Sequence, residues 1–177
     1  MTIELSMAEL REVTAYALTC AEPALAIFDR DVPGDRRPSA VLAEARMSAS
    51  GGKRTQRLRA AALGAHRAAR AANEMGLDVA GEAARAAGHA GGAAFLHPLA
   101  RPTQVIHILG SAAYAAHACE LDSGGDWMVG AAFVREATSW ASPTVARVLS
   151  RYPQAPPGGR RAGELVRQLD TALRMLA

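Results

Sequence analysis

The chain has 177 residues, the usual size of one domain, and it is long enough to bury a hydrophobic core without disulfides or metals. Half of its residues are apolar but only 5% are aromatic, so small side chains, alanine above all, must fill much of that core. The net charge is +3, from 20 basic and 17 acidic residues, which is too mild to indicate a nucleic-acid-binding protein.

The cysteines, the N-terminus and the length of the apolar runs all favour the same cellular location. Cys20 and Cys119 lie far apart in apolar, helix-like contexts, which is typical of buried free thiols in a reducing cytoplasm. The N-terminus lacks the basic region and apolar core of a signal peptide, and no apolar run approaches the ~20 residues that span a bilayer. We therefore expect a cytoplasmic protein without a membrane segment.

The first helix is predicted to begin after Ser6, because Ser6 and Glu9 have the spacing of a capping box. Apolar residues then recur at helical spacing. Pro23 lacks an amide donor, so we expect a kink or a new helix start next to it, with helix resuming over residues 24–30. Residues 32–35, Val-Pro-Gly-Asp, have the composition of a turn.

The rest of the chain shows helical patterns that are separated by breaks containing glycine or proline. Several patterns begin after Ser, Thr or Asp, the residue types that cap helix N-termini. The predicted helices cover residues 38–49, 56–73, 79–96, 103–121, 127–140, 143–151 and 161–176. No segment shows the alternation of a β-strand. The sequence therefore predicts an all-α array of seven to nine helices that forms one domain over residues 1–177.

The helices over residues 79–96 and 103–121 are predicted to lie at the centre of this compact array. They are dense in alanine and glycine, and such small residues let neighbouring helix backbones approach closely. Gly88, Gly91 and Gly92 lie inside the helical pattern rather than after a strand, so they do not form a phosphate-binding loop. We expect these three glycines to mark the closest contact between helices.

Three helices each carry a polar stripe with one histidine, at about 100° per residue. The stripes consist of His66, Arg70 and Asn73, of Glu82, Arg85 and His89, and of Gln104, His107, Ser111 and Tyr114. Stripes that converge would line a polar pocket between helices, where ligand sites of helical bundles are common. The candidate pocket residues are His66, Glu82, His89, His107, Ser111 and Tyr114. The alternatives are exposed helix faces, or buried histidines that donate to backbone carbonyls.

The sequence contains no recognisable catalytic or metal-binding motif. It has no HxxxH or HExxH pair, no CxxC and no GxSxG. We therefore expect no metal and no cofactor, and we assign no catalytic residue. The sequence leaves open whether the chain is an enzyme.

Two segments are candidates for a protein-binding surface. Trp127 and Trp140 flank one predicted helix, and anchoring in the core is the usual role of tryptophan. If they are exposed, they and Arg135 are candidates for an interface. Residues 53–70 contain the densest basic run, which is typical of a solvated helix face and alternatively fits an acidic partner.

Four segments of the chain have a distinctive pattern. They are LREVTAYALTCAEPALAIFDRDVPGDRRP at Leu10–Pro38, AALGAHRAAR at Ala61–Arg70, AARAAGHA at Ala83–Ala90 and GSAAYAAHA at Gly110–Ala118. Together with His97 and His107 they resemble the bacterial family of putative immunity proteins over about residues 5–122. Two segments depart from the family pattern: the connection over residues 97–104 is longer, and WMVGAAFVREATSW replaces an aromatic-rich segment.

The resemblance implies a small all-α cytoplasmic protein from a bacterial polymorphic toxin system. The function that it implies is non-catalytic binding and neutralisation of a cognate toxin protein, and it carries over no catalytic residues. Inhibitors of nucleases tend to be acidic, so a net charge of +3 fits a nuclease target poorly. The polar stripes support an alternative function in self-resistance or biosynthesis. This would be a small-molecule-binding protein or a cofactor-independent enzyme, with a His/Tyr-lined pocket where a histidine moves a proton.

Overall fold

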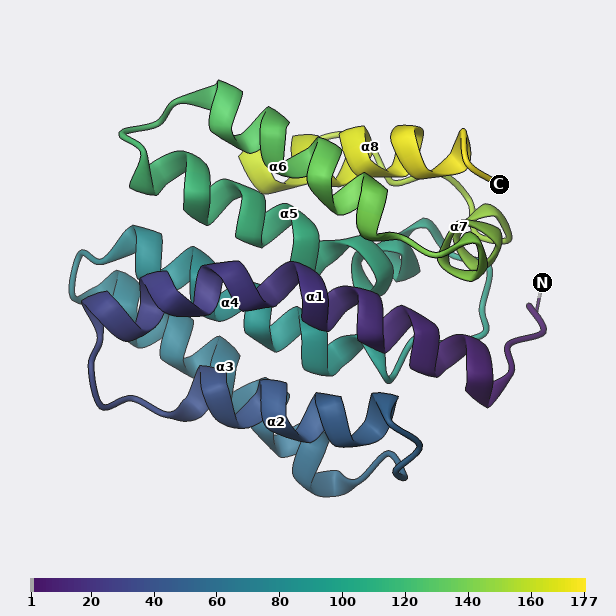
Figure 1. Ribbon diagram of the computed structural model, residues 1–177, viewed down its shortest axis with the longest axis horizontal. Coiled ribbons are helices and arrows are strands. Elements are labelled where there is room, and N and C mark those ends of the chain that lie inside the picture. The colour runs from purple at the N-terminus through teal and green to yellow at the C-terminus, as the bar shows by residue number, and fades with distance from the viewer. Residues whose placement is uncertain (1) are drawn as a thin grey trace.

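Residues 2–177, which the computed structural model describes, form eight α-helices and no strand (Figure 1). The helices are α1 (Met7–Asp31), α2 (Arg37–Ala49), α3 (Gln56–Glu74), α4 (Asp78–Ala93), α5 (Val105–Asp122), α6 (Trp127–Trp140), α7 (Pro143–Ser150) and α8 (Arg161–Arg174). A 3-10 turn, η1 (Pro102–Gln104), precedes α5. The predicted all-α array of seven to nine helices is therefore confirmed. Over the same residues, no helix combines the length and apolar character that a membrane crossing needs.

The two helices rich in alanine and glycine, α4 and α5, lie at the centre of the array, as predicted. Helix α4 packs against α1, α2, α3 and α5, and α5 packs against α1, α4, α6 and α8. Figure 1 shows α2 and α3 along one edge of the molecule and α6 and α8 along the opposite edge. Most of the surface of α4 and α5 is therefore covered by other helices.

Small side chains build the core at this centre. Nearly all alanines of α4 and α5 are completely buried, and larger groups such as Phe28, Leu58 and Leu165 come from the surrounding helices. Alanine has the highest helix propensity and loses no side-chain entropy on burial. The centre is thus made of helices that form readily and pack closely.

Side-chain caps fix where several helices begin. The predicted capping box of α1 is present: the Ser6 amide donates to the Glu9 carboxylate at 2.8 Å, and the Glu9 amide donates to the Ser6 hydroxyl at 3.2 Å. The side chains of Thr55, Asp126 and Ser142 each accept from one backbone amide at the start of α3, α6 and α7. These side chains satisfy amide donors that have no partner inside the helix.

The predicted restart of the first helix next to Pro23 is wrong. Helix α1 runs unbroken for 25 residues from Met7 to Asp31. Pro23 is exposed, whereas Ala21 and Ala24 on either side of it are buried. The side of the helix that lacks an amide donor therefore faces solvent, while packing against α4 and α5 stabilises the helix along its buried face.

Candidate functional site

Polar rings from α3, α4 and α5 meet at the centre of the array, where glycines leave room for them. A Cβ at Gly88 of α4 would lie 2.7 Å from Nε2 of His66, and a Cβ at Gly110 of α5 would lie 2.9 Å from the His89 ring. His66 and His89 pack edge to face, with ring centroids 5.1 Å apart. His89 also stacks on Tyr114, with centroids 4.9 Å apart. One residue from each of the three predicted stripes thus joins a continuous row of rings.

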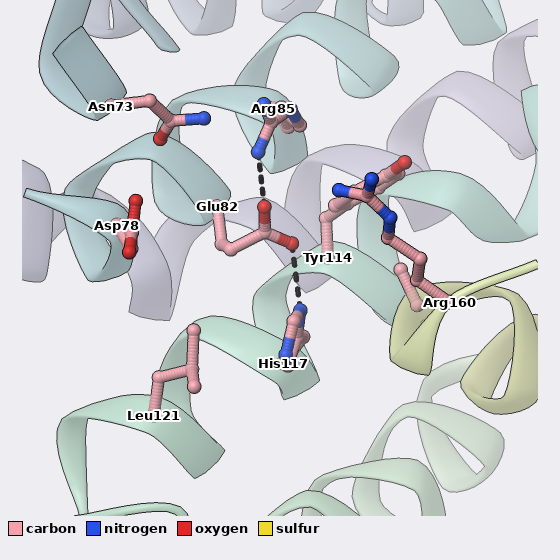
Figure 2. Close-up of a pocket in the computed structure, with 9 residues that line it drawn as sticks. Asn73, Asp78, Glu82, Arg85, Tyr114, His117, Leu121 and Arg160 are labelled. Carbon is pink, nitrogen blue, oxygen red and sulfur yellow. Dashed lines mark hydrogen bonds and ion pairs between the residues drawn. The ribbon is translucent and has the colours of Figure 1, made fainter. Parts of the chain in front are cut away.

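Two cavities adjoin this row. The first, the Glu82 cavity, has a volume of about 480 Å³ and lies among residues of α3, α4, α5 and the start of α8; its lining includes Glu82 and Tyr114 (Figure 2). The second, the histidine cavity, has a volume of about 270 Å³ and is lined in part by His66, His89 and His107. The structure therefore divides five of the six candidate pocket residues between two cavities.

Glu82 is buried in the first cavity, and its two carboxylate oxygens bond different partners. Oε1 accepts from the guanidinium of Arg85, one turn further along α4. Oε2 lies 2.7 Å from Nδ1 of His117 on α5, and Figure 2 shows both contacts. A buried carboxylate needs such partners to remain charged. The contact with Glu82 orients the His117 ring and leaves Nε2 as its remaining polar atom.

Other polar groups of the Glu82 cavity are less constrained. Among residues 2–177, Asp78, Tyr114 and Arg160 line the cavity without a hydrogen bond or ion pair from their side chains. Burial raises the pKa of Tyr114, and the negative charge of Glu82 raises it further. The side-chain oxygen of Asn73 is buried without a hydrogen-bond partner in the described chain. Donors and acceptors therefore remain available for a polar ligand.

The Glu82 cavity can support proton transfer but offers no obvious nucleophile. His117 oriented by a carboxylate has the arrangement of a general base and its positioning group. No Ser, Thr or Cys lines this cavity. Nowhere in residues 2–177 do three or more His, Cys, Asp or Glu side chains form a group that could hold a metal ion.

The histidine cavity has a different chemical character, because no carboxylate lines it. Burial lowers the pKa of His66, His89 and His107, and that of His89 falls to about 3. All three rings are therefore neutral at pH 7. Nδ1 of His107 lies 3.1 Å from the carbonyl oxygen of Gly92 and donates to it.

Ser111, the remaining candidate pocket residue, lies outside both cavities. It is 1% exposed, and its hydroxyl donates to the Ala17 carbonyl of α1 at 2.7 Å. Ser111 therefore links α5 to α1 instead of facing α3 and α4.

Sequence reasoning missed several residues of the two cavities, Asp78 and Arg160 among them. His117 lines the Glu82 cavity, and its position three residues after Tyr114 was a usable signal, since such residues are neighbours on a helix. Arg59 and Phe95 line the histidine cavity. Phe95 falls inside the helix predicted over residues 79–96, but α4 ends at Ala93, so helical spacing does not place the Phe95 side chain.

The candidate interface residues all lie on α6, but they do not share one face. Trp127 is 65% exposed and Met128 is 61% exposed, so core anchoring does not describe Trp127. Arg135 is exposed and lies within about 80° of Trp127 around the helix. Trp140 is 36% exposed, packs edge to face on Phe133 at 5.7 Å and lies about 140° away from Trp127.

Comparison with known proteins supports the family resemblance seen in the sequence. The sequence model of the family described as Imm-5 like putative immunity protein matches residues 4–142, which is most of the chain. The match includes α1 to α6 and the histidine cavity, whereas α7, α8 and Arg160 lie beyond it. No curated protein and no solved structure is significantly similar to the chain.

Proposed function

We propose that this chain, which belongs to the Imm-5 like putative immunity protein family, binds a cognate bacterial toxin and neutralises it without catalysis. Membership of the family supports a toxin as the partner in general, and the identity of the toxin is open to experiment. We propose the cytoplasm as the place of action, because the free thiols Cys20 and Cys119 are stable in a reducing compartment.

The observation that carries this proposal is the exposed start of α6. Trp127 and Met128 are neighbours in sequence, and both have most of their side-chain surface in solvent. Arg135, about two turns further along α6, is exposed and has no ion pair to any residue from 2 to 177. Tryptophan and arginine dominate the binding energy of protein interfaces, and exposed large apolar groups gain most from being covered. A specific complex centred here should bury about 1,000 Å² or more in total.

Co-expression with a toxin encoded beside this chain tests the proposal. The unaltered chain should restore growth, and Trp127→Ser with Met128→Ser should abolish protection. Loss of a central tryptophan typically costs about 2 kcal/mol or more of binding free energy. The matched control is Met47→Ser, because Met47 is 60% exposed on α2 at the opposite edge of the molecule. Full protection by the α6 double variant, together with unchanged affinity for the purified toxin, would rule out this surface.

A second candidate function is turnover of a small molecule in the Glu82 cavity. The Glu82–His117 contact of 2.7 Å favours it, because this contact presents His117 Nε2 as a proton acceptor. The same growth assay separates the two functions through His117→Gln, whose amide can still donate to Glu82. Toxin binding through α6 predicts that this variant protects fully. An enzyme acting through His117 predicts loss of protection in this variant and full protection by the α6 double variant.

A further inference from the structure

The histidine cavity lies apart from the α6 surface and takes no part in the proposed toxin binding. Helices α3 and α6 occupy opposite edges of the molecule (Figure 1). The lining of the histidine cavity contains the Arg59 guanidinium and three imidazole rings, but no carboxylate. A cavity that has one guanidinium and several imidazole N–H groups in its lining, and no acid, favours an anion.

Arg59 supplies a permanent cation to this cavity. Its guanidinium lies over the ring of Phe95, with Cζ 4.7 Å from the ring centroid. In the described chain the side chain of Arg59 makes no hydrogen bond or ion pair, whereas Arg57 two residues earlier pairs with Glu44 at 2.6 Å. The contact with Phe95 therefore restrains the guanidinium while its N–H donors stay free. Such a fork of donors matches the two oxygens of a carboxylate.

The remaining walls of the cavity are flat and largely apolar. The rings of His66, His89 and His107 meet the side chain of Ile106 there. The volume of about 270 Å³ lies just below the range of sites for drug-sized ligands, so it suits a compound with one ring. Neither His66 nor His89 uses its ring nitrogens in a hydrogen bond within residues 2–177, so both rings retain donors for a ligand.

We propose that the histidine cavity binds a small planar organic anion, namely one conjugated ring that bears one carboxylate. The carboxylate pairs with Arg59, and the ring packs against the imidazoles of His66 and His89. This site is independent of toxin binding, because it shares no residue with the α6 surface.

A bound anion leaves a spectroscopic signature on the histidines. A negative charge nearby favours protonation, so binding raises the pKa of His66 and His89 from their lowered values. His97 lies outside the cavity and serves as an internal reference. The imidazole Cε1–H resonances of the full chain, assigned through single His→Gln variants, report both occupancy and protonation.

Titration of the full chain with benzoate, followed by these resonances, tests the site. We expect benzoate to cause saturable shifts at His66 and His89 with an affinity in the millimolar range. Benzyl alcohol has the ring without the charge, and acetate has the charge without the ring. Both should cause much weaker shifts. Arg59→Gln should weaken benzoate binding about tenfold or more, since it removes a charge-assisted contact. The matched control Arg67→Gln removes an exposed cation on α3 outside the cavity and should leave the affinity unchanged.

Three results would overturn the proposal. The first is the absence of a saturable shift at His66 and His89. The second is equal binding of benzoate and benzyl alcohol, because the cavity would then recognise the ring alone. The third is equal weakening by Arg59→Gln and Arg67→Gln, which would mean that only the overall charge of α3 attracts the anion. Arg59 and Arg67 are both exposed, so neither substitution endangers the fold, and far-UV circular dichroism verifies this.

Discussion

At the scale of single residues, polar side chains enter this core where a facing residue has no side chain. The pairs are Gly81 with Asn73, Gly88 with His66, Gly110 with His89 and Gly130 with Glu120. A ring or carboxylate between two close helices needs the volume that a Cβ would occupy. These glycines therefore give space to polar groups of the neighbouring helix, and this brings His66 and His89 into an alanine-rich interior.

The neutral state of His89 makes the stability of the fold depend on pH. Burial lowers its pKa from 6.5 to about 3, so between these values the unfolded chain binds more protons than the folded chain. The contribution of the neutral His89 ring to the stability of the fold is complete above about pH 6.5 and is lost as the pH falls toward 3. For His89 alone, the free energy of unfolding should fall by up to about 1.4 kcal/mol per pH unit. Burial of His66 and His107 acts in the same direction.

Urea unfolding between about pH 7 and pH 5 measures this dependence above the range where carboxylates titrate. His89→Phe keeps an aromatic ring against Tyr114 but does not titrate, so its stability should fall less steeply with acid than that of the unaltered chain. Equal slopes for the two proteins would show that folding does not shift the pKa of His89.

The candidate site was only partly predictable from the spacing of its residues in the sequence. Helical spacing identified His66, His89 and Tyr114 as polar positions on small-residue helices, and these three do form one row of rings. Spacing within one helix says nothing about which face of the next helix lies opposite. The division into two cavities, and the turn of Ser111 toward α1, depend on that tertiary pairing and were beyond the sequence.

At the scale of helices, local chemistry set most boundaries, and tertiary packing decided the exceptions. Caps such as Thr55 and Asp126 act on the amides next to them, so the starts of α3 and α6 could be read from the sequence. The continuity of α1 through Pro23 could not, because it depends on contacts with α4 and α5. The role of a glycine inside a helix also depends on tertiary packing, because the sequence does not show whether that glycine faces solvent or another helix.

Two glycines of neighbouring helices should therefore respond in opposite ways to alanine. A Cβ at Gly91 of α4 would overlap with Val41 and would lie 3.1 Å from the Ala62 Cβ, so Gly91→Ala should destabilise by about 1–3 kcal/mol through overpacking. A Cβ at Gly64 of α3 would have only Arg37 nearby, at 4.0 Å. Gly64→Ala should stabilise by about 0.5–1 kcal/mol through helix propensity.

Thermal melts of the two single variants measure these effects directly. A Gly91→Ala protein as stable as the unaltered chain would mean that α4 lies further from α2 and α3 than the structure has it. Gly92 provides a further comparison, because a Cβ there would meet only His107, at 3.6 Å, and should be tolerated.

At the scale of the whole molecule, the helices beyond the family match complete the core. Helix α8 packs against α5, α6 and α7, and buries Leu165, Leu169 and Leu173. Glu120 of α5 is 7% exposed, and the Arg161 guanidinium donates to both of its oxygens at 2.8–3.1 Å. We therefore propose that residues 1–177 fold as one cooperative unit, although the family match ends at residue 142.

Removing residues 143–177 tests this unit. The truncated chain would leave the apolar face of α5 in water and the Glu120 carboxylate without its partner, so we expect it to lose cooperative unfolding. The full chain should unfold in one transition, with the same midpoint by far-UV circular dichroism and by the fluorescence of Trp127 and Trp140. Arg161→Gln in the full chain is the milder variant and should cost about 3 kcal/mol, because it leaves a buried charge unpaired. If the truncated chain keeps a sharp unfolding transition at the midpoint of the full chain, α1 to α6 form the folding unit, and α8 does not contribute to its stability.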